Sequence, residues 1–265
     1  MPTVRSPAVA GLFYPAEPDQ LGRDVQYLLS EAQHHDLVPK ALIVPHAGYI
    51  YSGAIAATAY ATLKPFASII RRVVLLGPTH RVAVRGLALP GVDAFDTPLG
   101  RIMLDKAAAQ LISHLPQVSV SALAHAQEHS LEVQLPFLQR VLTDFTLLPL
   151  AVGMATPDEV AEVLEILWGG DETLIVISSD LSHFLPYALA QRADRKTADD
   201  ILKLHQPIEH EQACGGTPIS GLIVAAQQHR LMPQLLDLRN SGDTSGTMDR
   251  VVGYAAFAFT EQNKT

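Results

Sequence analysis

Short apolar runs alternate with amphipathic segments along most of the chain, and this alternation predicts strands and helices in turn. Aliphatic and β-branched runs predict strands at residues 42–44, 73–76, 87–89, 146–152, 173–177, 235–238 and 251–259. Helical spacing or small-residue composition predicts helices at 18–32, 52–63, 105–114, 130–141, 156–167, 186–204 and 218–229. This order favours the α/β class, as a three-layer α/β/α sandwich with a mostly parallel or mixed central sheet.

Three of the apolar runs end in a turn that carries a histidine. His46 follows the run at 42–44, His80 the run at 73–76 and His183 the run at 175–177. Open α/β sheets bind ligands just beyond the carboxyl ends of their strands. His46 and His80 are separated by about the ~30 residues of one βαβ unit, and its right-handed crossover places both at the same sheet edge. We therefore expect three imidazoles on one rim, as a metal or acid/base site.

The composition is that of an ordinary globular protein. The 265 residues are 48% hydrophobic and 17% charged, enough to bury a sizeable core without a staple. No Pro/Gly/Ser-rich linker, low-complexity tract or internal repeat marks a boundary, so residues 1–265 are expected to form a single domain.

Charge and hydropathy argue against two classes of partner. Lys and Arg total 19 against 27 Asp and Glu, for a formal net charge of −8, and the phosphate-neutralising clusters typical of nucleic-acid binding are missing from the sequence. The apolar runs are shorter than the ~20 residues of a transmembrane helix. Together with the single cysteine, Cys214, these features predict a cytoplasmic protein that binds neither nucleic acid nor membrane.

The candidate ligands each have a structural alternative. His46 and His80 follow proline-containing turns that aim a side chain rigidly, as a metal requires, although a lone histidine is more often a hydrogen-bonded structural residue. Cys214 precedes two glycines and an expected helix. A helix amino terminus lowers a thiol pKa and favours a thiolate ligand or nucleophile, whereas a lone cysteine is more often a small buried hydrophobe.

Two further clusters suggest acid/base chemistry. His183 is a candidate general acid/base, with Asp180 orienting an imidazole or a metal-bound water. A serine hydrolase is disfavoured because the sequence has no Gly-x-Ser-x-Gly elbow and Asp180 and His183 are too close for a dispersed triad. Glu128 and His129 either belong to the site or form a capping cluster, with Ser130 as the helix cap. A role for His125 at the site is less favoured still, and six histidines are expected at the surface: His34, His35, His114, His205, His210 and His229.

Several motifs, in order over nearly the whole chain, together carry a resemblance. They are residues 5–15 (RSPAVAGLFYP), 45–53 (PHAGYIYSG), 76–80 (LGPTH), 97–100 (TPLG), 128–132 (EHSLE), 178–183 (SSDLSH), 213–215 (ACG) and 251–254 (VVGY). The chain resembles the Memo-like family, the Memo component of the AmmeMemoRadiSam system, which is distantly similar to class III extradiol ring-cleaving dioxygenases.

The resemblance implies roles for individual residues. His46 and His80 match the family's two metal-site histidines, Cys214 matches its metal-site cysteine, and His183 matches the acid/base histidine of the dioxygenases. A thiolate would then stand where the dioxygenases have the carboxylate of their facial triad, and a softer ligand favours Cu(I), zinc or a redox-active iron centre. Gly216 and Thr217 also replace the larger basic residue that many relatives carry after Cys-Gly.

Three functions follow from these features. The first is a metal-dependent oxidoreductase in which His46, His80 and Cys214 hold a metal ion, iron first and copper or zinc as alternatives, while His183, Asp180 and His129 are catalytic. The second is a vestigial enzyme that binds a peptide, a small molecule or a partner protein of the AmmeMemoRadiSam system in the same cleft. The third is a zinc-dependent hydrolase.

Overall fold

Two sheets organise residues 2–261, the part of the chain that the computed structural model describes. The strands, in chain order, are β1 (Val4–Arg5), β2 (Pro39–Val44), β3 (Arg72–Pro78), β4 (Leu87–Leu89), β5 (Ala94–Thr97), β6 (Gly100–Met103), β7 (Val118–Val120), β8 (Thr146–Val152), β9 (Thr173–Ser178), β10 (His183–Leu185), β11 (Leu231–Asn240) and β12 (Val251–Glu261). Among these residues the main sheet has nine strands in the order β10-β12-β2-β9-β3-β8-β4-β7, with β11 paired to β12. The smaller sheet is formed by β1, β5 and β6.

The centre of the main sheet is parallel and its flanks are mixed. Strands β2, β9, β3 and β8 pair in parallel, whereas β12 is antiparallel to β2 and β4 is antiparallel to β8. Successive residues of β3 enter opposite cores, with Val73 and Leu75 on one face and Val74 and Leu76 on the other. Burial on both faces explains why these strands read as continuous apolar runs in the sequence.

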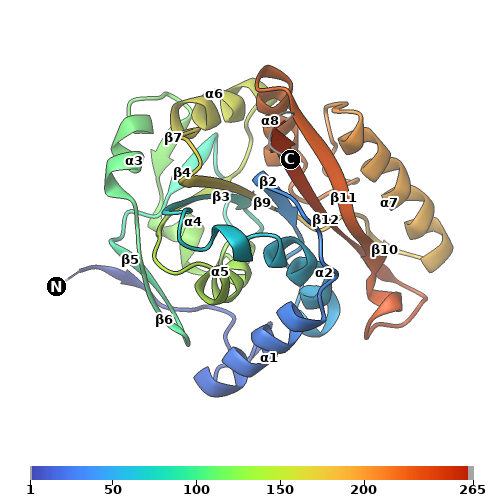
Figure 1. Cartoon of the computed structure of the whole chain (residues 1–265). Helices are drawn as coiled ribbons and strands as arrows, with labels where there is room; N and C mark the ends of the chain where they lie inside the picture. Colours follow the sequence, from blue (N-terminus) through green and yellow to red (C-terminus); the bar gives the residue numbers. More distant parts are fainter. Residues whose placement is uncertain (1, 262–265) are drawn as a thin grey trace.

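Helices cover both faces of this sheet, as Figure 1 shows. Helices α1, α2 and α5 pack on one face, and α3, α6, α7 and α8 contribute to the core on the other. The expected three-layer α/β/α arrangement is confirmed. The helices are α1 (Pro18–Glu31), α2 (Tyr49–Ala61), α3 (Lys106–Ile112), α4 (Ala122–Ala126), α5 (Leu135–Val141), α6 (Pro157–Leu167), α7 (Tyr187–Leu202) and α8 (Gly216–Gln228), with 3-10 turns at η1 (Lys64–Phe66), η2 (Glu132–Gln134) and η3 (Ser241–Asp243).

The expected helix at 130–141 is wrong in its first part. Residues 132–134 form the 3-10 turn η2, and the α-helix begins only at Leu135. The reason is Pro136, whose ring in a longer helix would clash with the carbonyl of residue 132, so it lies in the first turn instead. Ser130 is therefore not a helix cap, and its Oγ donates a hydrogen bond to the Pro78 carbonyl at 2.9 Å. By contrast, the expected cap at Thr156 is confirmed, with Glu159 completing a capping box.

Five short strands were not predicted from the sequence. Strands β1, β5, β6, β7 and β10 span two to four residues each, too few to display a periodicity of two. Within residues 2–261, the helices are all too short or too polar to cross a membrane.

Candidate metal centre

The turns after β2 and β3 bring His46 and His80 together at the carboxyl edge of the sheet. Their ring centroids are 5.3 Å apart, so the predicted convergence is confirmed for this pair. The two strands do not touch, because β9 lies between them and pairs with both. His46 is buried, whereas the side chain of His80 is partly open to solvent.

His129 completes a cluster of three imidazoles. Its ring centroid lies 5.4 Å from that of His46 and 4.7 Å from that of His80. One ring nitrogen of each histidine lies within 4.8 Å of the other two, a spacing at which all three could hold one metal ion. The catalytic role expected for His129 stays a prediction, and the structure places its ring beside the two proposed ligands. It lies in the loop between α4 and η2, so no strand end marks it in the sequence.

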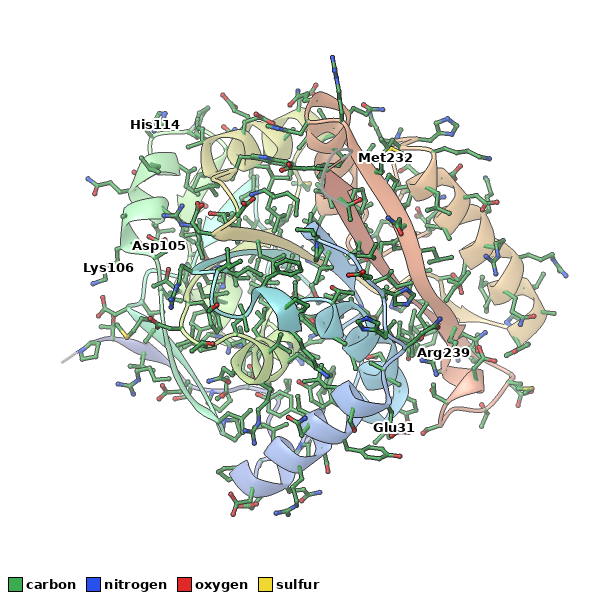
Figure 2. The ribbon with its side chains drawn as sticks, in the orientation of Figure 1. Glu31, Asp105, Lys106, His114, Met232 and Arg239 are labelled. Carbon is green, nitrogen blue, oxygen red and sulfur yellow. The ribbon has the colours of Figure 1, made fainter. Side chains whose placement is uncertain are left out.

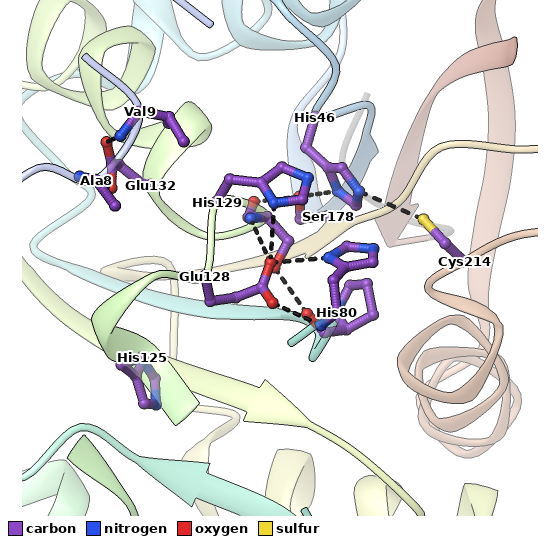
Figure 3. A network of polar contacts seen from close by, with 12 residues as sticks. Ala8, Val9, His46, His80, His125, Glu128, His129, Glu132, Ser178 and Cys214 are labelled. Atoms are coloured by element: carbon purple, nitrogen blue, oxygen red, sulfur yellow. Dashed lines mark hydrogen bonds and ion pairs between the residues drawn. The ribbon is translucent and has the colours of Figure 1, made fainter. Parts of the chain in front are cut away.

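Glu128 fixes the orientation of His80. Its buried carboxylate accepts hydrogen bonds from the backbone N–H of His80 at 2.6 Å, from His80 Nδ1 at 2.8 Å and from the Ser130 N–H at 2.9 Å. Figure 3 shows this carboxylate between His80 and His129. Because a carboxylate only accepts, His80 carries its proton on Nδ1 and its Nε2 is free for a metal. The capping alternative for Glu128 is thus wrong.

The electrostatics suit metal binding. Burial lowers the pKa of His129 to about 4 and holds the pKa of His46 well below its usual range, with the neighbouring imidazoles adding to both effects. Burial raises the pKa of Glu128, but the hydrogen bonds from His80 and Ser130 outweigh this and bring it to about 2. At neutral pH His46 and His129 are therefore neutral imidazoles, the form in which histidine binds a metal.

Cys214 lies beside the cluster, just before α8. Its Sγ is 3.3 Å from His46 Nε2, and the Gly215 N–H donates to Ser179 Oγ at 2.8 Å, which locks the loop to the end of β9. The expected lowering of the thiol pKa is wrong: burial and the nearby Asp180 raise it to about 12. The alternative of a small buried residue is the one that the structure supports, because Cys214 is buried. Only a bound cation would make this thiol a thiolate, and its role as a ligand stays a prediction.

Asp180 and His183 occupy different positions in the site. Asp180 is buried, and its Oδ1 accepts the backbone N–H of His46 at 2.7 Å, so it holds the turn that aims this histidine. Burial raises the Asp180 pKa to about 7. His183 begins β10 and is exposed, and it lies outside the cluster of three imidazoles. The catalytic roles expected for both residues stay predictions, as does the ligand set His46, His80 and Cys214.

The other histidines lie outside the cluster. His125 is buried, and its Nε2 is 2.7 Å from the Ala88 carbonyl, which is a structural contact. His114 projects from the periphery (Figure 2). His229 is half-buried, stacks on Trp168 with centroids 3.7 Å apart and pairs with Glu165. His35 is also half-buried, and the remaining three are exposed: His34, His205 and His210.

Ser178 and Gln134 were not recognised as site residues from the sequence. Both are fully buried, and Ser178 Oγ lies 2.9 Å from His46 Nδ1 and 2.8 Å from Gln134 Nε2. A glutamine between the apolar Val133 and Leu135 was the available signal, because a buried amide needs polar partners.

Comparison with known proteins finds relatives that match nearly the whole chain. A MEMO1 family protein of Methanosarcina barkeri is 37% identical over 270 residues, covering 96% of this chain and 98% of that protein. A MEMO1 family protein of Aquifex aeolicus is 35% identical, covering 97% of this chain and 99% of that protein. The solved structure of an uncharacterized protein from Escherichia coli K12 aligns with a TM-score of 0.48 and 12% identity, covering 81% of this chain and 98% of that one. The family model of Memo-like proteins matches residues 5–258, and the chain belongs to this family.

Proposed function

We propose that the protein is a metal-dependent oxidoreductase whose metal ion is held by His46, His80 and His129, with Cys214 as an additional ligand. The observation that carries the proposal is the cluster of three imidazoles with a thiol 3.3 Å from one of them. Imidazole and thiolate donors suit iron, copper and zinc rather than magnesium or calcium, which prefer oxygen. Iron is the first candidate and copper the second.

The buried carboxylates support the ligands without joining them. Glu128 binds the Nδ1 side of His80, and Asp180 binds the main chain of His46. The donor set therefore differs from the two-histidine, one-carboxylate facial triad of non-haem iron oxygenases. When bound, a redox-active ion would supply electron transfer and an open coordination position. His183, which is exposed, is the group that would give or take a proton at substrate.

One observation favours a second candidate, a zinc-dependent hydrolase. Three histidine imidazoles are the ligand set of some catalytic zinc sites, which keep a fourth position for water. Zinc lowers the pKa of that water to about 7, so hydrolysis would need no redox chemistry.

Elemental analysis of anaerobically purified protein tests both candidates. We expect close to one iron or copper per chain, and a His129→Ala variant that stays folded should lose it. His114→Ala, at the exposed periphery, is the matched control. Oxygen uptake on a panel of catechols then separates the oxidoreductase from the zinc enzyme. Folded wild-type protein that takes up no metal would contradict both, and would favour a module that binds a peptide, a small molecule or a partner protein in this cleft.

A further inference from the structure

Three buried polar side chains, Tyr60, Gln134 and Ser178, form a chain of hydrogen bonds that ends at His46 Nδ1. Tyr60 Oη donates to Gln134 Oε1 at 2.9 Å, Gln134 Nε2 donates to Ser178 Oγ at 2.8 Å, and Ser178 Oγ lies 2.9 Å from His46 Nδ1. Tyr60, Gln134 and Ser178 are each fully buried and come from α2, η2 and β9. The chain of hydrogen bonds therefore links α2, η2 and β9 to Nδ1 of His46.

The direction of the first two hydrogen bonds is fixed by a main-chain carbonyl. Gln134 Nε2 also lies 2.9 Å from the Pro45 oxygen, which can only accept. The atom facing Pro45 must therefore be the amide nitrogen, and its second proton points to Ser178 Oγ. The amide oxygen is left to accept from Tyr60.

A second carbonyl fixes the proton of Ser178. Its Oγ is 2.6 Å from the Ser130 oxygen, a distance at which two oxygens need a proton between them. A serine hydroxyl has one proton and two lone pairs. With the proton given to Ser130 and one lone pair used by Gln134, only a lone pair is left for His46. The contact with His46 Nδ1 is then favourable only if the ring donates.

We infer that the pair Gln134 and Ser178 is a positioning device that holds His46 in its Nδ1-protonated form and leaves the lone pair of Nε2, on the side of Cys214, free to bind a metal ion. The direction of Nε2 agrees with its contact to Cys214 Sγ, a thiol that can donate to it, shown in Figure 3. The protonation of the ring stands independently of any metal, whereas its purpose, presenting a ligand atom, rests on the proposed function.

His46 and His80 are thus both protonated on Nδ1, but different acceptors hold the proton there. His80 is held by a charged acceptor, Glu128, and His46 by a neutral one, Ser178. The ring of His46 is fully buried, and a neutral acceptor places no charge beside it. Loss of such supporting groups lowers metal affinity about 10- to 100-fold in characterised sites.

Long-range proton–nitrogen correlation spectra of metal-free, ¹⁵N-histidine-labelled protein at pH 7 test the protonation directly. We expect His46 to carry its proton on Nδ1 in the wild type, and Ser178→Ala to show a mixture of both forms. A wild-type ring protonated on Nε2, or a Ser178→Ala spectrum identical to wild type, would overturn the inference. The wild-type measurement decides even if the variant fails to fold.

Zn²⁺ affinity, measured by competition with a chelator, tests the purpose of the device. We expect Ser178→Ala to bind Zn²⁺ about 10- to 100-fold more weakly than wild type, and Ser178→Thr, which keeps the hydroxyl, to recover most of the loss. Thr62→Val removes a buried hydroxyl that bonds the Ala59 carbonyl in α2 and should bind as wild type does. Unchanged affinity in Ser178→Ala would refute the positioning role. A wild type that binds no Zn²⁺ would instead count against the proposed metal site, while the spectra would still decide the protonation.

Discussion

Two glutamates four residues apart, Glu128 and Glu132, are both buried, yet they serve different parts of the molecule. The carboxylate of Glu132 binds the amino-terminal segment: Arg5 at 2.8 Å, the backbone N–H groups of Ala8 and Val9, and the hydroxyl of Tyr14. Glu128 instead binds His80 and Ser130. The residue type and the burial are the same, so only the partners tell a structural carboxylate from one that serves the site.

The two regions are also connected. The guanidinium of Arg5 donates to the His125 carbonyl at 2.6 Å and to the Glu128 carbonyl at 2.7 Å. The amino-terminal segment thus holds the last turn of α4 and the main chain of Glu128 itself. We expect a change at Glu132 to affect mainly folding, and a change at Glu128 to affect mainly metal binding.

The largest effect is expected for Glu132→Gln. Removing this charge leaves the guanidinium of Arg5 buried without its partner, and breaking a buried ion pair typically costs about 3–5 kcal/mol. The free energy of unfolding, measured with urea, should fall by this amount. Asp144→Asn is the matched control, because its pair with Arg71 is exposed and worth less than about 1 kcal/mol. Equal losses in the two variants would contradict the assignment of Glu132 as a structural anchor.

A pH effect is expected from His125, on the structural side of the comparison. Burial lowers the pKa of His125 to about 4, against about 6.5 in an unfolded chain. Between these values the unfolded state binds the extra proton, so His125 stabilises the fold above pH 6.5 and this contribution is lost as the pH falls towards 4. His125→Gln should reduce the slope of unfolding free energy against pH by up to about 1.4 kcal/mol per pH unit. Parallel curves for wild type and variant would refute the expected contribution of His125.

Strand-end reasoning located part of the site. It found His46 and His80 because continuous apolar runs mark buried parallel strands, and each run is followed directly by its histidine. The same reasoning gave the three-layer fold. It could not find the contact of His129 with these two rings, because His129 lies in a loop whose position depends on Arg5, more than a hundred residues away.

The sequence did not show which distant segments pack against a given residue. Cys214 precedes a helix, as expected, yet its pKa is raised because the surrounding core removes water. Glu128 and Glu132 occur in one short motif, and nothing in that motif separates their partners. Both cases depend on which distant segments pack against a residue, and this is decided by the tertiary structure.

The smallest free-energy change is expected at the site, for Glu128→Gln. The amide carries no charge to stabilise the Nδ1 proton of His80, so the imidazole becomes a poorer ligand. Metal affinity should fall about 10- to 100-fold, which corresponds to about 1.4–2.8 kcal/mol. Chelator competition with Zn²⁺ measures the affinity, and urea unfolding of the metal-free variant should show a smaller loss of stability than Glu132→Gln.

Glu165→Gln provides the matched control for this change. Glu165 also pairs with a histidine, His229, at 2.7 Å, but this pair lies at the surface and outside the imidazole cluster. If carboxylate–histidine pairs in general raised metal uptake, both variants would lose affinity. If orientation of His80 is the cause, only Glu128→Gln will. The opposite outcome is a Glu128→Gln variant that keeps wild-type metal affinity and loses as much stability as Glu132→Gln. That result would show that both glutamates stabilise the fold and that neither serves the metal site.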